Sequence, residues 1–263
     1  MVRRRKSCAG RRNQLSLIYM KAIILAAGQA KRLRPLTDRL PKCLLRLGNK
    51  TILDYQIDAL NQNKITKIIL VVGFEAKKII AHLRHNYPSG KFTFIRNPKF
   101  ETTGPAYSLR LAKKYLKQQV LYLNSDSVFD PAIIKRIIKS KKDSVTATQQ
   151  VPWDEEEVNV VLDKENRVFE IGKQISRELS CGEFIGVTKL GAAFNRKLLA
   201  SLDEFTKTGE TKKFAADGLN RAIQHGGKLF SLDVTGLPAI EIDTLEDYTR
   251  AKRLRLFAGE HQK

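Results

Sequence analysis

The sequence predicts an α/β fold with a mixed, mostly parallel sheet flanked by helices. From Lys21 onward, short apolar runs alternate with amphipathic stretches of helical period, which is the pattern of successive βαβ units. The 263 residues include 42% hydrophobic and 29% charged residues, so the chain can bury a sizeable core. We therefore expect one domain at residues 20–257, with a disordered basic leader at residues 1–19 and a tail at residues 258–263.

The first half of this domain, residues 20–142, is predicted to alternate strands and helices regularly. Each expected strand is a short apolar run, and each expected helix places its apolar residues three or four positions apart. Ligands of open α/β sheets bind at the carboxyl ends of the strands, so we expect a site in the loops that follow them. The expected strands are 22–26, 67–72, 92–95 and 120–123, and the expected helices are 51–61, 75–86 and 106–116.

The second half, residues 143–257, is predicted to begin with strands joined by short polar segments. This pattern suits an antiparallel extension of the sheet, and helices follow it. No linker rich in Pro, Gly or Ser separates the halves, so we expect two lobes of one domain. The expected strands are 144–149, 158–162, 168–171 and 184–188, and the expected helices are 192–202, 215–224 and 245–256.

The charge is unevenly distributed along the chain. Residues 1–142 hold 31 basic and 7 acidic side chains, and residues 143–263 hold 17 and 20, which leaves net charges of +24 and −3. A basic surface indicates an anionic partner, which could be a nucleic acid, an anionic lipid surface or a phosphorylated small molecule. No recognition helix or interleaving of aromatic and basic residues appears, so we do not expect a nucleic acid.

Cysteine content and hydropathy bear on the compartment. The three cysteines form no CxxC motif, which favours a reducing compartment, and we expect the protein to be cytoplasmic. No apolar run approaches the roughly 20 residues that a membrane span requires, so we expect no span.

The loop after the first strand is the most informative segment. It reads LAAGQAKRLRPLT at residues 25–37 and continues as PKCLL at residues 41–45. Small residues allow the backbone to approach a phosphate or a base, and Arg32 and Lys42 add positive charge. Considered alone, the segment could equally be a tight turn with solvated basic residues.

Acidic residues follow two other expected strands. Asp126 comes directly after strand 120–123, where a carboxylate could hold Mg²⁺, although it could also be a turn or cap residue. Strand alternation places Glu241 and Asp243 on one face, as a second metal ligand would require. The competing interpretation is an N-cap, in which Asp243 or Thr244 caps the last helix.

Together these segments resemble the nucleoside-diphosphate-sugar pyrophosphorylase superfamily, with signature LAAGxGxRLxPLTxxxPKxLL. The match has one departure, because Ala30 replaces the second glycine, and a methyl group there is unfavourable if φ is positive. The resemblance spans roughly residues 20–257. It implies a Rossmann-like, glycosyltransferase-A-type nucleotidyltransferase fold, in which the first lobe binds the nucleotide and the second binds the acceptor.

The resemblance also implies roles for individual residues. The residues expected to act in catalysis are Arg32 and Lys42, which bind the triphosphate, and Asp126 and Asp243, which hold Mg²⁺ with Glu241 as a further ligand. The nucleotide is also expected to contact Leu25, Ala26, Ala27, Gly28, Gly104 and Ser108.

Two further segments are similar to the small choline-phosphate cytidylyltransferase branch. The segment at residues 102–109, TTGPAYSL, resembles its base loop, and Gly104 precedes a helix whose free N–H groups could face an anion or a base edge. The segment at residues 183–187, EFIGV, resembles an E[YF]IGI motif. The resemblance implies that the acceptor contacts Lys173, Glu183 and Asp217, although Glu183 and Asp217 could equally be plain structural residues.

The expected function is an Mg²⁺-dependent transfer of CMP from CTP to a phosphorylated small molecule, with release of pyrophosphate. The acceptor would be a phosphocholine-like compound, a phosphonate or a polyol phosphate. A sugar-1-phosphate uridylyl- or thymidylyltransferase is the alternative within the family. Alternatives of another class are a non-catalytic regulatory protein and a nucleic-acid-binding protein. The sequence is also compatible with a homo-oligomer.

Overall fold

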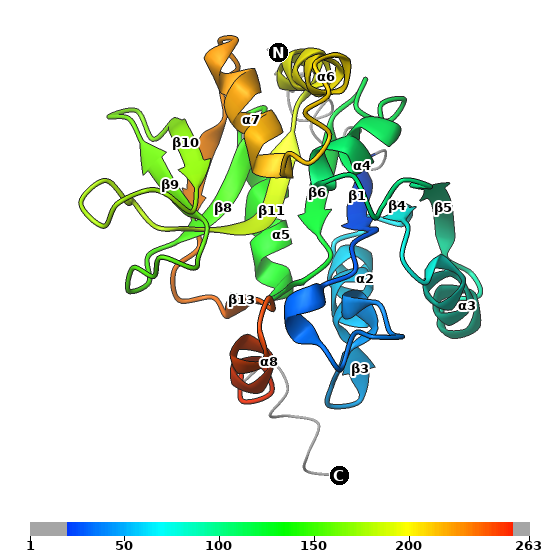
Figure 1. Cartoon of the computed structure of the whole chain (residues 1–263). Helices are drawn as coiled ribbons and strands as arrows, with labels where there is room; N and C mark the ends of the chain where they lie inside the picture. Colours follow the sequence, from blue (N-terminus) through cyan, green and yellow to red (C-terminus); the bar gives the residue numbers. More distant parts are fainter. Residues whose placement is uncertain (1–19, 255–263) are drawn as a thin grey trace, which may run out of the picture.

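A computed structural model describes residues 20–254 (Figure 1). Within this range a nine-stranded mixed sheet forms the centre, and helices cover both of its faces. This architecture confirms the predicted α/β fold. The predicted leader at residues 1–19 and the predicted tail at residues 258–263 lie outside the described residues.

The strands of the first half form the parallel part of the sheet. β1 lies between β4 and β6, and β5 adds to the outer side of β4, all in parallel. The apolar runs of β1, β4 and β6 are buried because helices cover both faces of this part of the sheet, whereas β5 at the edge has no fully buried residue. The bounds are β1 Lys21–Ala26, β4 Lys67–Val72, β5 Lys91–Arg96 and β6 Val120–Asn124.

The strands of the second half extend this sheet, as the sequence predicts. β11 pairs antiparallel with β6, and it connects the parallel strands to β8 and β9. β10 pairs with β9, and β12 pairs with β8. The bounds are β8 Val145–Gln149, β9 Asn159–Leu162, β10 Val168–Gly172, β11 Glu183–Leu190 and β12 Phe230–Asp233.

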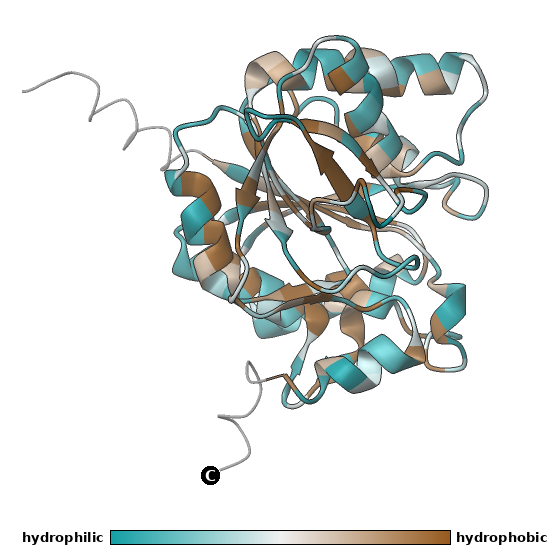
Figure 2. Cartoon of the chain, turned by 90° about the vertical axis from the view of Figure 1, so that its left-hand side faces the viewer, coloured by the Kyte–Doolittle hydropathy of each residue, from teal (hydrophilic) through white to brown (hydrophobic). Residues whose placement is uncertain are grey.

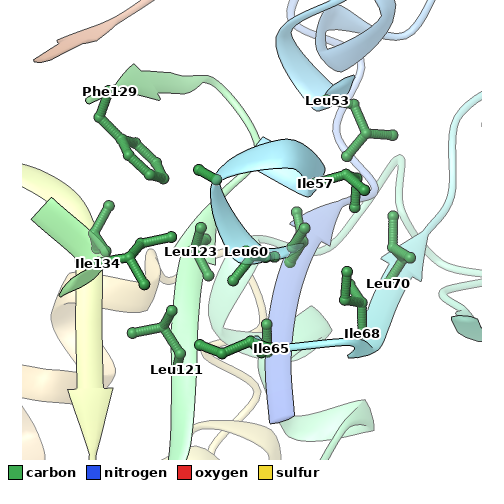
Figure 3. Packing of buried hydrophobic residues seen from close by; sticks show 14 of the residues in the cluster. Leu53, Ile57, Leu60, Ile65, Ile68, Leu70, Leu121, Leu123, Phe129 and Ile134 are labelled. Atoms are coloured by element: carbon green, nitrogen blue, oxygen red, sulfur yellow. The ribbon is translucent and has the colours of Figure 1, made fainter. Parts of the chain in front are cut away.

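Helices bury one apolar face each against the sheet. Figure 2 shows hydrophilic and hydrophobic residues side by side on single helices, as expected for helices that face both core and solvent. Figure 3 shows Leu53, Ile57 and Leu60 of α2 packed near the strand residues Leu70 and Leu123. One face carries α2 Ile52–Gln62, α3 Ala76–Asn86 and α5 Pro131–Lys139, and the other carries α4 Pro105–Leu111, α6 Ala192–Lys207 and α7 Ala215–Gln224.

Most boundaries lie close to the predicted ones, but the predicted helix 106–116 is too long. α4 ends at Leu111, and residues 112–117 form turns in which Leu116 N–H donates to the Lys113 carbonyl. The last helix, α8 Leu245–Ala251, also ends before the predicted 256. None of the helices within residues 20–254 is long and apolar enough to cross a membrane.

Short elements complete the region around the sheet's carboxyl edge. Two strands, β7 and β13, pair with each other outside the main sheet. A β-ribbon and two single-turn helices lie in the loops after β1. The bounds are β7 Ser127–Phe129, β13 Ala239–Glu241, β2 Arg46–Leu47, β3 Lys50–Thr51, η1 Lys31–Leu33 and η2 Lys42–Leu44.

A buried carboxylate joins α2 to α3. Asp54 accepts hydrogen bonds from the Thr51 main chain at 2.8 Å and the Thr51 hydroxyl at 2.7 Å, and the His82 ring nitrogen lies 2.7 Å from its other oxygen. Burial by itself would raise the pKa of Asp54, but the hydrogen bonds from His82 and Thr51 lower it to about 2.

The lowered pKa of Asp54 predicts that the free energy of unfolding decreases in acid. Because the pKa of Asp54 is about 2 in the folded chain against an ordinary 3.8, its contribution to stability is present above pH 3.8 and is lost as the pH falls towards 2. We expect Asp54→Asn to remove this part of the pH dependence of the unfolding free energy. Urea unfolding at several pH values measures it, with the exposed Glu101→Gln as control. Parallel pH curves for wild type and Asp54→Asn would contradict the assignment.

Candidate active site

A cleft of about 1140 Å³ opens at the carboxyl ends of β1 and β6. The loop after β1, the turn after β6 and the segment after β13 contribute its charged wall, and β10 and the start of α7 contribute the opposite wall. Of the predicted site residues, those that line the cleft are Leu25, Arg32, Lys42, Asp126, Lys173, Asp217, Glu241 and Asp243.

Pairing of β7 with β13 brings the predicted metal-binding acids Asp126, Glu241 and Asp243 together. Glu241 lies opposite Ser127 in this ladder, and Ile242 N–H donates to the Asp126 carbonyl at 3.1 Å. Asp126 precedes β7 and Asp243 follows β13, so both carboxylates reach one place although 117 positions separate them in the chain. Asp243 also precedes α8, whose capping box is formed by Thr244 and Asp247. The helix cap and the site position are therefore compatible.

Lys42 lies between these carboxylates. Its Nζ is 2.7 Å from Asp126 Oδ2 and 2.8 Å from Asp243 Oδ1. Arg32 contacts the other oxygen of Asp243 at 2.5 Å. Burial by itself would lower the pKa of Lys42, but the two carboxylates raise it above its ordinary value. Lys42 is therefore a fixed positive charge between two carboxylates.

One oxygen of Asp126 has no partner among residues 20–254. Asp126 Oδ1 is buried and accepts no hydrogen bond there, which is costly for a carboxylate oxygen. Mg²⁺ binds oxygen ligands and usually uses one or two protein carboxylates together with substrate phosphates. Asp126 and Asp243 fit that requirement. No cluster of three His, Cys, Asp or Glu side chains suited to a metal occurs in the described part of the chain.

Glu241 makes hydrogen bonds of its own in the same region. Its Oε1 accepts from Asn124 Nδ2 at 2.9 Å and from the Ser127 hydroxyl at 3.0 Å. Burial, with the neighbouring charge of Asp126, raises the pKa of Glu241 well above its ordinary range. These contacts hold the two ends of the turn that carries Asp126, so Glu241 positions this turn.

The loop after β1 turns sharply at Ala30. Its φ of 48° lies in the left-handed region, and its carbonyl accepts from Leu33 N–H at 3.0 Å and from the Thr37 hydroxyl at 2.8 Å. The family signature has glycine where this chain has Ala30, and the positive φ explains why glycine suits this position. The predicted contact residues Ala26 and Ala27 are buried, whereas Gly28 is exposed, and none of the three lines the cleft.

Ala30→Gly is expected to raise the free energy of unfolding by up to about 1 kcal/mol. Relief of the left-handed alanine exceeds the added entropy of glycine in the unfolded chain. Chemical denaturation of both proteins measures the difference. A stability loss in Ala30→Gly would contradict the strain inferred at this turn.

The predicted base loop lies beside the cleft, and two of its main-chain groups have other partners. Gly104 N–H donates to the Thr211 carbonyl at 2.7 Å, and Ala106 N–H donates to the Lys213 carbonyl at 3.1 Å. The prediction of free N–H groups was therefore wrong for these two, because residues 211–213 return over the start of α4. The Ser108 hydroxyl accepts from Asn97 at 3.0 Å and is buried, and neither Gly104 nor Ser108 lines the cleft.

The predicted acceptor residues occupy different environments. Lys173 lines the cleft and lies 3.9 Å from Glu156. Asp217 also lines it, and its carboxylate accepts from Phe214 N–H at 2.7 Å at the start of α7. Glu183 is buried and does not line the cleft. Burial, followed by the nearby charge of Glu157, raises its pKa to about 7.

Sequence reasoning missed two residues that shape the site. Glu156 lies 3.6 Å from Arg32 and 3.9 Å from Lys173, so one carboxylate connects cationic groups from the first and second halves of the chain. Gly186 has φ +70°, and a Cβ placed there would lie 2.5 Å from Glu241 Oε1. The glycine within EFIGV was a usable signal for Gly186, whereas Glu156 belongs to a run of three glutamates that carries none.

Comparisons with known proteins find similarity over most of the chain. A family model described as nucleotidyl transferase matches residues 21–168. The chain is similar to the bifunctional protein GlmU of Methanococcus maripaludis, with 29% identity over 82% of this chain and 50% of that protein. The chain spans about half the length of the GlmU relatives that it matches.

One relative and two solved structures match nearly from end to end. The choline-phosphate cytidylyltransferase of Streptococcus pneumoniae is 25% identical over 89% of this chain and 98% of that protein. The solved structure of the CTP:phosphocholine cytidylyltransferase from that species, LicC, has a TM-score of 0.73 and covers 89% of this chain and 97% of that chain. The inositol-1-phosphate CTP transferase from T. maritima shares the fold, with a TM-score of 0.78, 24% identity and coverage of 93% and 98%.

Proposed function

From the fact that this chain belongs to the nucleotidyl transferase family, we propose that it transfers CMP from CTP to the phosphate of a small, non-sugar acceptor. The observation that carries the proposal is the group formed by Arg32, Lys42, Asp126 and Asp243 at the carboxyl edge of the sheet. It places two cations and two carboxylates within one cleft, as transfer between polyanions requires.

The reaction uses the protein to align and neutralise the reactants. An oxygen of the acceptor phosphate, ionised at neutral pH, attacks the α-phosphorus of the nucleotide, and the bond to pyrophosphate breaks. Arg32 and Lys42 bind the triphosphate oxygens. Asp126 and Asp243 would hold Mg²⁺, which would neutralise charge on the phosphates. No protein nucleophile is needed, because fixed geometry lowers the barrier.

Two features support a non-sugar acceptor. Similarity to the choline-phosphate cytidylyltransferase extends over nearly the full length of both chains. Glu170 and Asp217 line the acceptor end of the cleft beside the exposed ring of Phe214. Carboxylates suit the hydroxyl groups of a polyol or the cationic end of a phosphocholine-like compound, and an aromatic face also attracts an ammonium group.

A second candidate is a sugar-1-phosphate uridylyl- or thymidylyltransferase. The GlmU relatives, at 29% identity over 82% of this chain, favour it. So does the UTP–glucose-1-phosphate uridylyltransferase AglF of Haloferax volcanii, which is 30% identical over 52% of this chain.

Pyrophosphate release distinguishes these candidates. CTP, UTP, dTTP, ATP and GTP are each tested with Mg²⁺ against phosphocholine, aminoethylphosphonate, inositol-1-phosphate and glucose-1-phosphate. We expect release with CTP and one of the first three acceptors. Turnover with only UTP or dTTP and glucose-1-phosphate would replace the proposal with the second candidate. Silence with every pair would contradict both candidates for these acceptors.

A further inference from the structure

The edge of the sheet opposite the cleft carries a row of lysines. Lys21, Lys67 and Lys91 are the first residues of β1, β4 and β5, and the parallel register pairs Lys21 with Lys67 and Lys67 with Lys91. The turns at residues 112–117 lead into the start of β6 at the same edge. We call Lys21, Lys67, Lys91, Lys113, Lys114 and Lys117 the lysine edge.

Most of these lysines have no carboxylate nearby to neutralise them. Among residues 20–254, no ion pair joins Lys91, Lys113 or Lys117 to an acid, and Lys21 and Lys114 instead approach the ring of Tyr115, at 5.4 and 4.9 Å. The cations of the active site, in contrast, are paired with acids. Other basic side chains occupy the last turns of two helices that lead into this edge, Arg84 and His85 in α3 and Arg110 in α4, so the lysines of the edge are not needed at those helix ends. The lysine edge is therefore a positive surface with excess charge.

From this surface we propose that the lysine edge docks the protein on an anionic lipid bilayer. Its cations are all lysines, whose compact charges on long stems suit many loosely ordered headgroups, whereas nucleic-acid recognition favours the planar fork of arginine. None of the large exposed apolar side chains of the described residues belongs to these segments, and the ring of Tyr115 is half-buried and approached by Lys21 and Lys114, so bases would find no fully exposed ring there on which to stack. Binding is thus electrostatic and peripheral.

The orientation keeps the cleft accessible. The cleft lies at the carboxyl ends of the parallel strands and the lysine edge lies at their amino ends, about 20 Å away for strands of this length. A bilayer against the lysine edge leaves the cleft open to small anionic substrates in solution. Docking and turnover can therefore occur together, and docking does not depend on which nucleotide the cleft accepts.

Vesicle sedimentation tests the proposal with the full chain. The probes are vesicles of phosphatidylcholine alone and vesicles in which one third of the lipid is phosphatidylglycerol. We expect binding only to the anionic vesicles and release when salt is raised, since surface charges are screened within about 10 Å at 0.1 M salt. The edge variant, Lys91→Gln, Lys113→Gln, Lys114→Gln and Lys117→Gln, should bind at least about tenfold more weakly.

A matched variant separates position from net charge. It removes four exposed lysines from other surfaces, as Lys77→Gln, Lys99→Gln, Lys207→Gln and Lys252→Gln, and should bind like wild type. A leader variant, Arg3→Gln, Arg4→Gln, Arg5→Gln and Lys6→Gln, should still bind the anionic vesicles, because it keeps the lysine edge. Circular dichroism checks that each variant folds.

Several outcomes would overturn the proposal. Absence of binding to anionic vesicles would do so, as would equal losses in the edge variant and the matched variant. A loss confined to the leader variant would assign binding to residues 3–6 instead. Tighter binding to a single-stranded RNA than to vesicles at equal salt, abolished in the edge variant, would make the lysine edge a nucleic-acid surface.

Discussion

Asp126→Asn is expected to lower kcat by at least about 10²–10³-fold while leaving a folded protein. Asparagine keeps the shape of the side chain but loses the negative charge that would hold Mg²⁺, at a position where one oxygen is buried and unpartnered within residues 20–254. It also weakens the contact with Lys42, which keeps Asp243 as its second partner. Asp243→Asn should have a comparable effect, because Asp243 contacts both Arg32 and Lys42.

Two measurements make this result specific. Pyrophosphate release gives kcat, and titration with Mn²⁺ followed by electron paramagnetic resonance gives metal affinity, which both variants should weaken. Asp38→Asn is the matched control, because Asp38 is an exposed acid that pairs with Arg34 and does not line the cleft. Near-normal turnover and Mn²⁺ affinity in both Asp126→Asn and Asp243→Asn would show that these acids do not hold the metal.

The parts of the fold that depend on local pattern could be predicted well. β1, β4 and β6 are short apolar runs buried from both sides, and their observed ends lie within one residue of the predicted ones. The prediction of a helix at 106–116 was wrong beyond Leu111. The lysine-rich end of this segment contains good helix formers, but from Ala112 onward main-chain N–H groups donate to the carbonyl three residues back instead of four. Leu116 is fully buried in the core along this path, and local propensity does not report such a tertiary contact.

The candidate site could also be predicted only in part from the sequence. Arg32, Lys42 and Asp126 follow strands, so their position at one edge could be inferred from the order of elements. The approach of Asp243 to Asp126 depends on the pairing of β7 with β13, a contact between short segments far apart in the chain. The resemblance of EFIGV to a family motif placed Glu183 in the site, yet Glu183 is buried away from the cleft, and Gly186 of the same segment lies against Glu241 of the site.

Gly186→Ala should destabilise the fold by about 2–5 kcal/mol and strongly reduce turnover. The φ of Gly186 is +70°, which is unfavourable for alanine. An added Cβ would lie 2.5 Å from Glu241 Oε1, 2.7 Å from Ser127 Oγ and 2.8 Å from Asn124 Nδ2. The contacts that hold the turn carrying Asp126 would then have to separate, so stability and activity should fall together. Chemical denaturation and pyrophosphate release measure the two effects.

Gly209→Ala separates backbone strain from this close packing. Gly209 has φ +79°, but an added Cβ there meets nothing within 4 Å, so only the left-handed backbone should matter. We expect Gly209→Ala to cost about 1–2 kcal/mol and to leave kcat unchanged. The excess loss in Gly186→Ala then measures the contact with Glu241, Ser127 and Asn124. If the two variants lose equal stability and Gly186→Ala stays active, the neighbours yield to a methyl group, and the position of Asp126 does not depend on the close approach of β11.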